Sequence, residues 1–184
     1  MKILTIVGGI AANSINKKLL DLIKPLAPAD FEFTGFDITT LPYFSQDIEQ
    51  NPPQPVITLR EKITAASGVL FVTPEYNRSI PGVLKNAIDW PSRPYGNNTW
   101  KGKCAGTLGA SMGAIGTFGA QTQLRALLSF LDMRVMYQPE LYFNFVAFVK
   151  PAEGPKGRPQ LEEKSQKFFT AYLAAFREWI VKNG

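Results

Sequence analysis

The chain contains no histidine and a single cysteine, Cys104, among its 184 residues. The absence of histidine excludes Ser-His-Asp and Cys-His nucleophiles, His-ligated zinc and an imidazole proton shuttle. One cysteine can form neither an internal disulfide nor a cysteine-based metal cluster, and we expect no metal site. We therefore expect any chemistry to come from a bound cofactor or from carboxylates alone.

Long apolar runs are also missing. No stretch approaches the roughly 18–20 apolar residues that span a bilayer, and no small-residue cleavage site follows the apolar residues 1–8. We expect a cytoplasmic protein without a membrane span. Apolar residues make up 45% of the chain and charged residues 19%, which indicates a globular protein rather than a disordered one. The length fits one domain covering residues 1–184.

The net charge of +5 is concentrated in one segment. Residues 91–160 hold 8 Lys and Arg against 3 Asp and Glu, and the rest of the chain is balanced. This segment, which includes Arg93, Lys101 and Lys103, is either a solvated basic surface or a region that attracts a polyanionic small molecule such as a nucleotide. Its basic residues are scattered without interleaved aromatic residues, so we expect no nucleic-acid binding.

Short apolar segments alternate with amphipathic ones along the chain. We predict strands at residues 2–7, 31–36, 68–73, 104–110 and 134–137, with 141–149 extending the last strand or forming another. We predict helices at residues 15–26, 56–66, 81–90, 121–132 and 161–180. This alternation predicts an α/β fold: a flavodoxin-like, doubly wound, five-stranded parallel sheet with helices on both faces.

Three loops are expected to meet at the ligand-binding edge of such a sheet, beyond the carboxyl ends of the strands. They are residues 8–16, 73–81 and 110–119. The first loop is rich in small residues and leads into a helix, so its backbone N–H groups suit a phosphate, with Ser14 and Asn16 as further donors. It matches neither the dinucleotide fingerprint nor the P-loop, and a plain turn capped by Ser14 is the alternative.

The second loop places polar side chains directly after an apolar strand. Tyr76 offers a flat face for a ring, and Asn77 carries both a donor and an acceptor for the edge of a heterocycle. Glu75 has no visible acid–base partner, so we expect it to form structural hydrogen bonds. Arg78 either pairs with a nucleotide phosphate or lies in solvent.

The third loop carries glycines at positions 113, 116 and 119. Glycine lets the main chain come close to a ligand and leaves N–H and C=O groups free to bind the edge of a ring. A flexible connector is the alternative interpretation.

Motifs in these loops resemble the NAD(P)H-dependent FMN reductases, which include bacterial quinone, chromate and azo-dye reductases. The motifs are Gly8-Gly9 followed by Ser14 and Asn16, the block PEYNRSIPGVLKNAIDW from Pro74 to Trp90, and Ser111-Met112-Gly113. The resemblance covers about residues 2–150, and the Pro74–Trp90 block is its most specific part. It implies FMN as cofactor, NAD(P)H as co-substrate, and a homodimer or homotetramer with flavin sites near subunit interfaces.

By this resemblance, the first loop holds the FMN phosphate, the second lines the isoalloxazine and the third lies along its pyrimidine side. The cofactor-binding residues that it implies are Gly9, Ala11, Ser14, Ile15, Asn16, Pro74, Glu75, Tyr76, Asn77, Ser111, Met112, Gly113 and Gly116, with Arg78 toward NAD(P)H. Gly9 and Ala11 stand where the family usually has serine and arginine. Because a charge-assisted hydrogen bond is worth about 1.5–3 kcal/mol, we expect weakened FMN binding.

We predict an FMN-dependent oxidoreductase that passes electrons from NAD(P)H to quinones or other small acceptors by a ping-pong mechanism. We assign no catalytic residue, because the flavin carries the chemistry. Two alternatives stay open. One is a flavodoxin-type electron carrier, although such carriers are typically acidic and this chain is basic. The other is a flavin-free binding or regulatory module, which Gly9 and Ala11 motivate.

Overall fold

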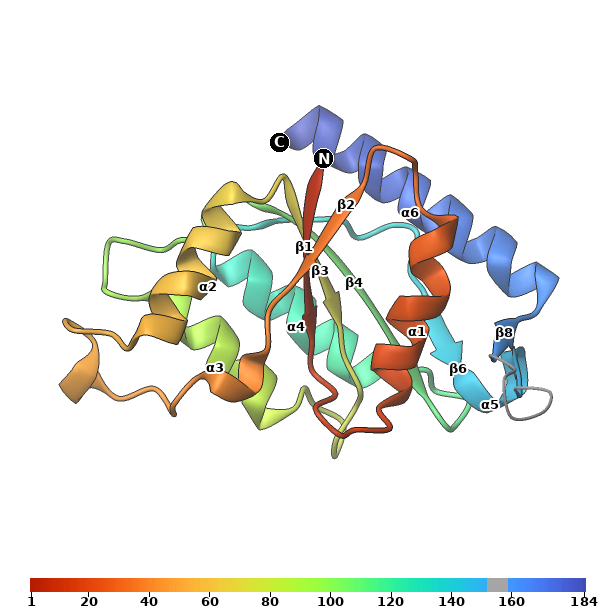
Figure 1. Cartoon of the computed structure of the whole chain (residues 1–184), viewed down its shortest axis with the longest axis horizontal. Coiled ribbons are helices and arrows are strands. Elements are labelled where there is room, and N and C mark those ends of the chain that lie inside the picture. Colours follow the sequence, from red (N-terminus) through yellow and green to blue (C-terminus); the bar gives the residue numbers. More distant parts are fainter. Residues whose placement is uncertain (152–158) are drawn as a thin grey trace.

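A parallel β-sheet forms the centre of the computed structural model, which describes residues 1–151 and 159–184 (Figure 1). Its strands lie in the order β2 (Glu32–Gly35), β1 (Lys2–Val7), β3 (Gly68–Val72), β4 (Cys104–Ser111) and β5 (Arg134–Val135). A further strand, β6 (Tyr142–Asn144), pairs with the last residues of β4, whereas β5 pairs with the first. The predicted flavodoxin-like order is confirmed, and residues 141–149 contribute a separate strand.

Helices cover both faces of the sheet (Figure 1). One face carries α1 (Ile15–Ile23) and α6 (Glu163–Asn183), and the other carries α2 (Gln54–Ala65), α3 (Gly82–Asp89) and α4 (Phe118–Phe130). The shorter elements are α5 (Phe145–Phe148), the strands β7 (Val149–Lys150) and β8 (Gln160–Leu161), and the 3-10 turns η1 (Lys24–Leu26), η2 (Ile38–Thr40), η3 (Gln46–Ile48) and η4 (Trp90–Ser92). No helix among residues 1–151 and 159–184 is both long and apolar enough to cross a bilayer.

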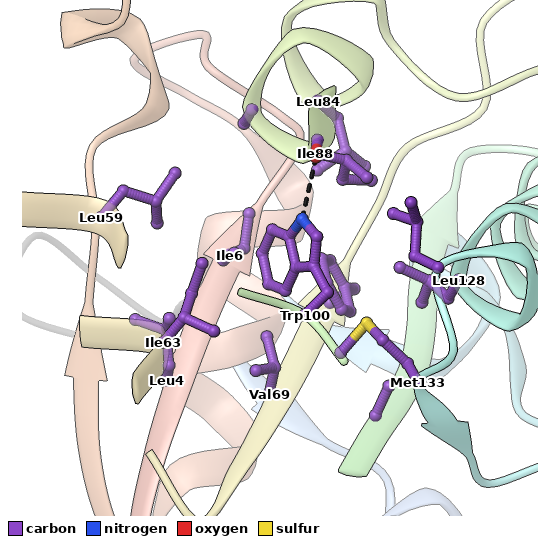
Figure 2. Packing of buried hydrophobic residues seen from close by; sticks show 14 of the residues in the cluster. Leu4, Ile6, Leu59, Ile63, Val69, Leu84, Ile88, Trp100, Leu128 and Met133 are labelled. Atoms are coloured by element: carbon purple, nitrogen blue, oxygen red, sulfur yellow. Dashed lines mark hydrogen bonds between the residues drawn. The ribbon is translucent and has the colours of Figure 1, made fainter. Parts of the chain in front are cut away.

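The core on the α2, α3 and α4 side surrounds a buried tryptophan, Trp100 (Figure 2). Its side chain is fully buried, and its indole Nε1 donates a hydrogen bond to the Ile88 carbonyl at 2.8 Å. The Phe71 ring, from β3, lies 5.8 Å away, centroid to centroid. This tryptophan therefore joins the end of α3 to the sheet through both packing and a hydrogen bond.

The loops that follow β1, β3 and β4 emerge together at one edge of the sheet. Val7 pairs with Val72, and Val72 pairs with Leu108, so β1 and β3 end side by side while β4 continues beside them to Ser111. Since β1 lies between β2 and β3, this edge contains the reversal in strand order where ligands bind in such folds. Figure 1 shows these loops at the lower edge of the molecule, away from both chain termini.

Lys101 and Lys103 lie at the opposite edge, because they precede β4 rather than follow it. The Lys103 ammonium donates to the carbonyls of Thr64 and Ala66 at the end of α2, at 2.7 and 2.9 Å, and burial lowers its pKa. Lys101 lies 3.8 Å from the Asp132 carboxylate. Of the two interpretations of this basic segment, attraction of a phosphate to the loops therefore does not hold for these two lysines.

Candidate functional site

A cavity of about 220 Å³ lies where the three loops meet. Ten of the thirteen predicted cofactor-binding residues line it, together with Ala110: Gly9, Ala11, Ser14, Ile15, Asn16, Pro74, Glu75, Tyr76, Ser111 and Met112. Asn77, Gly113 and Gly116 lie outside this lining. Residues far apart in the sequence thus form one concave surface.

The first loop presents unused hydrogen-bond donors at the beginning of α1. Five backbone N–H groups donate to no acceptor among the described residues: those of Ala11, Ala12, Asn13, Ile15 and Asn16. Ser14 caps the helix, because its Oγ accepts from the Lys17 N–H at 3.4 Å. The Ser14 side chain is 8% exposed and lines the cavity, and its hydroxyl proton remains available to a ligand. Such a helix N-terminus favours an anion.

Asn16 fastens the first loop to the end of β4. Its side chain is buried, with Nδ2 donating to the Ala110 carbonyl at 3.0 Å and Oδ1 accepting from the Ala110 N–H at 2.8 Å. The sequence suggested Asn16 as a donor to a phosphate, and the structure instead engages its amide with the main chain of β4. This residue positions the cavity wall.

The second loop reverses direction in a tight two-residue turn. Tyr76 and Ser79 exchange both backbone hydrogen bonds at 2.9 Å, and the residues between them, Asn77 and Arg78, have φ values of 51° and 67°. Asparagine is favoured at left-handed positions of such turns. The backbone therefore explains the asparagine, whose side chain is exposed and lies outside the cavity lining.

Glu75 and Ser79 tie this turn to α4. The Glu75 carboxylate is 7% exposed; Oε2 accepts from the Ala120 N–H at 3.1 Å, and Oε1 lies 3.3 Å from the Arg78 guanidinium. The Ser79 hydroxyl donates to Gln123 Oε1 at 2.7 Å. Glu75 is the only carboxylate in the cavity lining, and these bonds give it a structural role. They also hold Tyr76, which is 54% exposed, at the rim.

The third loop closes upon itself through Ser111. The Ser111 hydroxyl donates to the Gly113 carbonyl at 2.8 Å and accepts from the Gly116 N–H at 3.1 Å. Gly116 has a φ of 56°, and a Cβ there would lie 2.5 Å from the backbone of Tyr142 and Phe143. The glycine thus lets the loop pack against β6, and the close approach that the sequence suggested is to the chain itself.

The cavity combines features that suit a flat ring carrying a phosphate. Its lining includes Ala11, Ile15 and Asn16, whose N–H groups are free, and Ser14, together with apolar surface from Pro74, Tyr76 and Met112. Its lining contains no lysine or arginine and no pair of titratable groups placed for acid–base work. The predicted cofactor-binding residues did not include Ala110, although the third loop begins there, or the nearby Lys17, whose Nζ lies 3.2 Å from the Ile10 carbonyl.

Replacing Gly9 with alanine is expected to weaken binding of a phosphate-bearing ligand about tenfold, because the new Cβ collides with Ser14 Oγ. Loss of the Ser14 cap would also cost about 0.5–2 kcal/mol of folding free energy. Gly82→Ala is the matched control, since a Cβ at Gly82 meets no atom within 4 Å and the residue lies outside the cavity lining. Dissociation constants for FMN, measured by quenching of flavin fluorescence, compare the two variants. Equal affinities would show that Ser14 does not contact the phosphate.

Comparisons with known proteins agree with this geometry. The model of a family described as NADPH-dependent FMN reductase matches residues 1–147. A 2-hydroxy-1,4-benzoquinone reductase of Burkholderia sp is 41% identical over 180 residues, covering 98% of this chain and 96% of that protein. A quinone reductase of Pseudomonas putida is 40% identical over 179 residues, covering 97% and 94%.

Solved structures show the same relationship. The flavoenzyme NAD(P)H:(acceptor) oxidoreductase FerB from Paracoccus denitrificans aligns with a TM-score of 0.91 at 38% identity, covering 100% of this chain and 98% of that one. A WrbA-like flavodoxin from Agrobacterium tumefaciens aligns with a TM-score of 0.63 at 13% identity over 100% of this chain and 98% of its own, which shows a shared fold alone.

Proposed function

The chain belongs to the NADPH-dependent FMN reductase family, and from this premise we infer that the cavity between the three loops binds FMN. The protein then passes electrons from NAD(P)H to a quinone or another small acceptor. The observation that carries the proposal is the meeting of the free N–H groups of the first loop with Pro74, Tyr76 and Met112 in one cavity. The names of the relatives supply the acceptor class.

The residues present fit FMN. The free N–H groups of the first loop and the Ser14 hydroxyl would hold the phosphate, and Pro74, Tyr76 and Met112 would contact the ring. Main-chain groups between Ser111 and Gly113 would lie along its polar edge. When bound, FMN supplies the hydride chemistry, and the protein supplies binding and orientation.

The proposed mechanism needs no acid or base from the chain. Glu75 is engaged by Ala120 and Arg78, and we propose no step in which it exchanges a proton with substrate. Tyr76 and Met112 are 54% and 64% exposed at the rim, which leaves this side of the cavity open to solvent. We propose that NAD(P)H and the acceptor use this side in turn, in a ping-pong cycle, with the exposed Arg78 guanidinium attracting nucleotide phosphates.

An absorbance experiment tests the function and separates the alternatives. The purified protein is loaded with FMN, freed of excess flavin and mixed with NADPH in air, with and without a benzoquinone. Rapid bleaching followed by recovery, faster with the quinone, supports the enzyme. Slow bleaching without turnover indicates an electron carrier, and no flavin uptake at any concentration indicates a flavin-free module. Either of the last two results overturns the proposal.

We also propose that the protein is a cytoplasmic homodimer or homotetramer, since NAD(P)H is an intracellular metabolite and the α3–α4 side exposes aromatic side chains. Tyr95 and Phe130, 91% and 86% exposed, line a cavity of about 470 Å³ together with Phe44. Apolar surface of this kind favours association. Sedimentation at micromolar concentration is expected to show a species of at least twice the 20.4 kDa chain mass. A single species at the chain mass would contradict association.

A further inference from the structure

We propose that Lys17 supplies the cation for the phosphate of FMN, a charge that no residue lining the cavity provides. This inference rests on the FMN site proposed above and adds to it a specificity-determining residue. It concerns discrimination between flavins with and without a phosphate.

The cavity lining contains no cation of its own. Ala11, which lines the cavity from the first loop, carries no charge. The Arg78 guanidinium is 70% exposed and lies against the Glu75 carboxylate at 3.3 Å. Arg125 is buried in a separate network with Glu140 and Tyr142, at 2.8 and 3.0 Å. Any cation for the phosphate would therefore lie beside the cavity.

Lys17 reaches the first loop from within α1. It is the third residue of the helix, and helical side chains lean toward the N-terminus. Its Nζ lies 3.2 Å from the Ile10 carbonyl oxygen. A carbonyl oxygen and the next amide nitrogen are about 2.3 Å apart, so the ammonium lies within about 5.5 Å of the Ala11 nitrogen, one of the free donors. This is its one hydrogen bond to the described residues. The side chain also lines a neighbouring cavity of about 380 Å³ with Asp37, and the Lys17 charge helps to lower the pKa of that carboxyl.

The charge pattern of the helix points to an anion at this end. The first turn of α1 contains no acidic residue, although acidic side chains are the ones that stabilise this end of a helix. Lys17 and Lys18 instead place two positive charges near the positive end of the helix dipole. A phosphate on the free N–H groups would lie within about one Debye length of the Lys17 ammonium, about 8–10 Å in ordinary buffers. Lys17 would then favour the phosphate and oppose the helix when no phosphate is bound.

Lys17→Gln tests the assignment, with Lys18→Gln as the matched control. Both variants remove one charge from consecutive positions of the same helix, but only Lys17 reaches the loop. Dissociation constants for FMN and riboflavin are measured at low and high salt by flavin fluorescence, and the melting temperature is measured without flavin.

Lys17→Gln is expected to weaken FMN binding about three- to tenfold at low salt, with a smaller effect at high salt. Riboflavin binding should not change, and the flavin-free melting temperature should stay the same or rise. Lys18→Gln should change FMN affinity less than twofold. Adding Ala11→Arg should restore FMN affinity to the Lys17→Gln variant and improve the wild type less.

Equal FMN affinities for the two glutamine variants would overturn the role of Lys17. An equal loss of riboflavin affinity would also overturn it, because the lysine would then act on the shape of the loop. If the wild-type protein binds no flavin, the proposed function itself fails, and that outcome differs from both of these.

Discussion

Asn16→Leu is expected to lower the free energy of unfolding by about 2–6 kcal/mol and to weaken FMN binding more than tenfold. Asn16 is 1% exposed and satisfies both the N–H and the carbonyl of Ala110. Leucine fills a similar volume but leaves these two buried groups without partners, at about 1–3 kcal/mol each. The contact between the first loop and the end of β4, both of which line the cavity, is lost as well.

Asn13→Leu is the control for this substitution. Asn13 is exposed in the same loop, and its side chain makes no hydrogen bond to the described residues. Urea unfolding and FMN titration of the two variants provide the comparison. If Asn16→Leu matches Asn13→Leu in both stability and affinity, the link between Asn16 and Ala110 does not position the site.

Trp100→Ala is expected to lower the free energy of unfolding by about 3–5 kcal/mol. The indole is fully buried among residues of β1, β3, α3 and α4, as Figure 2 shows, and its Nε1 bonds to Ile88. Trp100→Phe retains most of the apolar contact and loses this bond, so a smaller loss of about 1–2 kcal/mol is expected. Under conditions where each variant is folded, FMN affinity should stay within twofold, because Trp100 does not line the cavity.

Urea unfolding of the two Trp100 variants measures these losses. A loss below about 1 kcal/mol for Trp100→Ala would mean that the core rearranges to fill the space. If a folded Trp100 variant instead loses flavin affinity, packing around Trp100 would influence the conformation of the binding loops.

The fold could be predicted because its signals are local. The apolar runs at β1, β3 and β4 and the amphipathic spacing of α1 and α6 each indicate an element, and their alternation indicates the sheet. The sequence did not decide whether residues 141–149 extend the strand predicted at 134–137 or form another strand. Two residues of β5 and three of β6 pair with opposite ends of β4, and segments this short carry too few residues to show a period.

The composition of the cavity could be predicted in large part, whereas the direction of individual side chains could not. Asn77 is explained by a left-handed backbone position, which the sequence does not distinguish from a ligand contact. Asn16 bonds to Ala110, 94 residues away, and only the folded chain brings the two together. Lys101 and Lys103 are different, because their position before a parallel strand already assigns them to the far edge of the sheet.

Amide hydrogen exchange with and without FMN tests most directly whether the three loops bind the cofactor. The N–H groups of Ala11, Ala12, Asn13, Ile15 and Asn16 make no bond to the described residues, so they should exchange rapidly in the flavin-free protein. FMN is expected to slow exchange at Ala11–Asn16 and around Tyr76 and Met112. Protection confined to the 540 Å³ cavity formed by Met1, Lys101–Lys103 and Ile180 at the opposite edge, or no protection at all, would contradict a site between the loops.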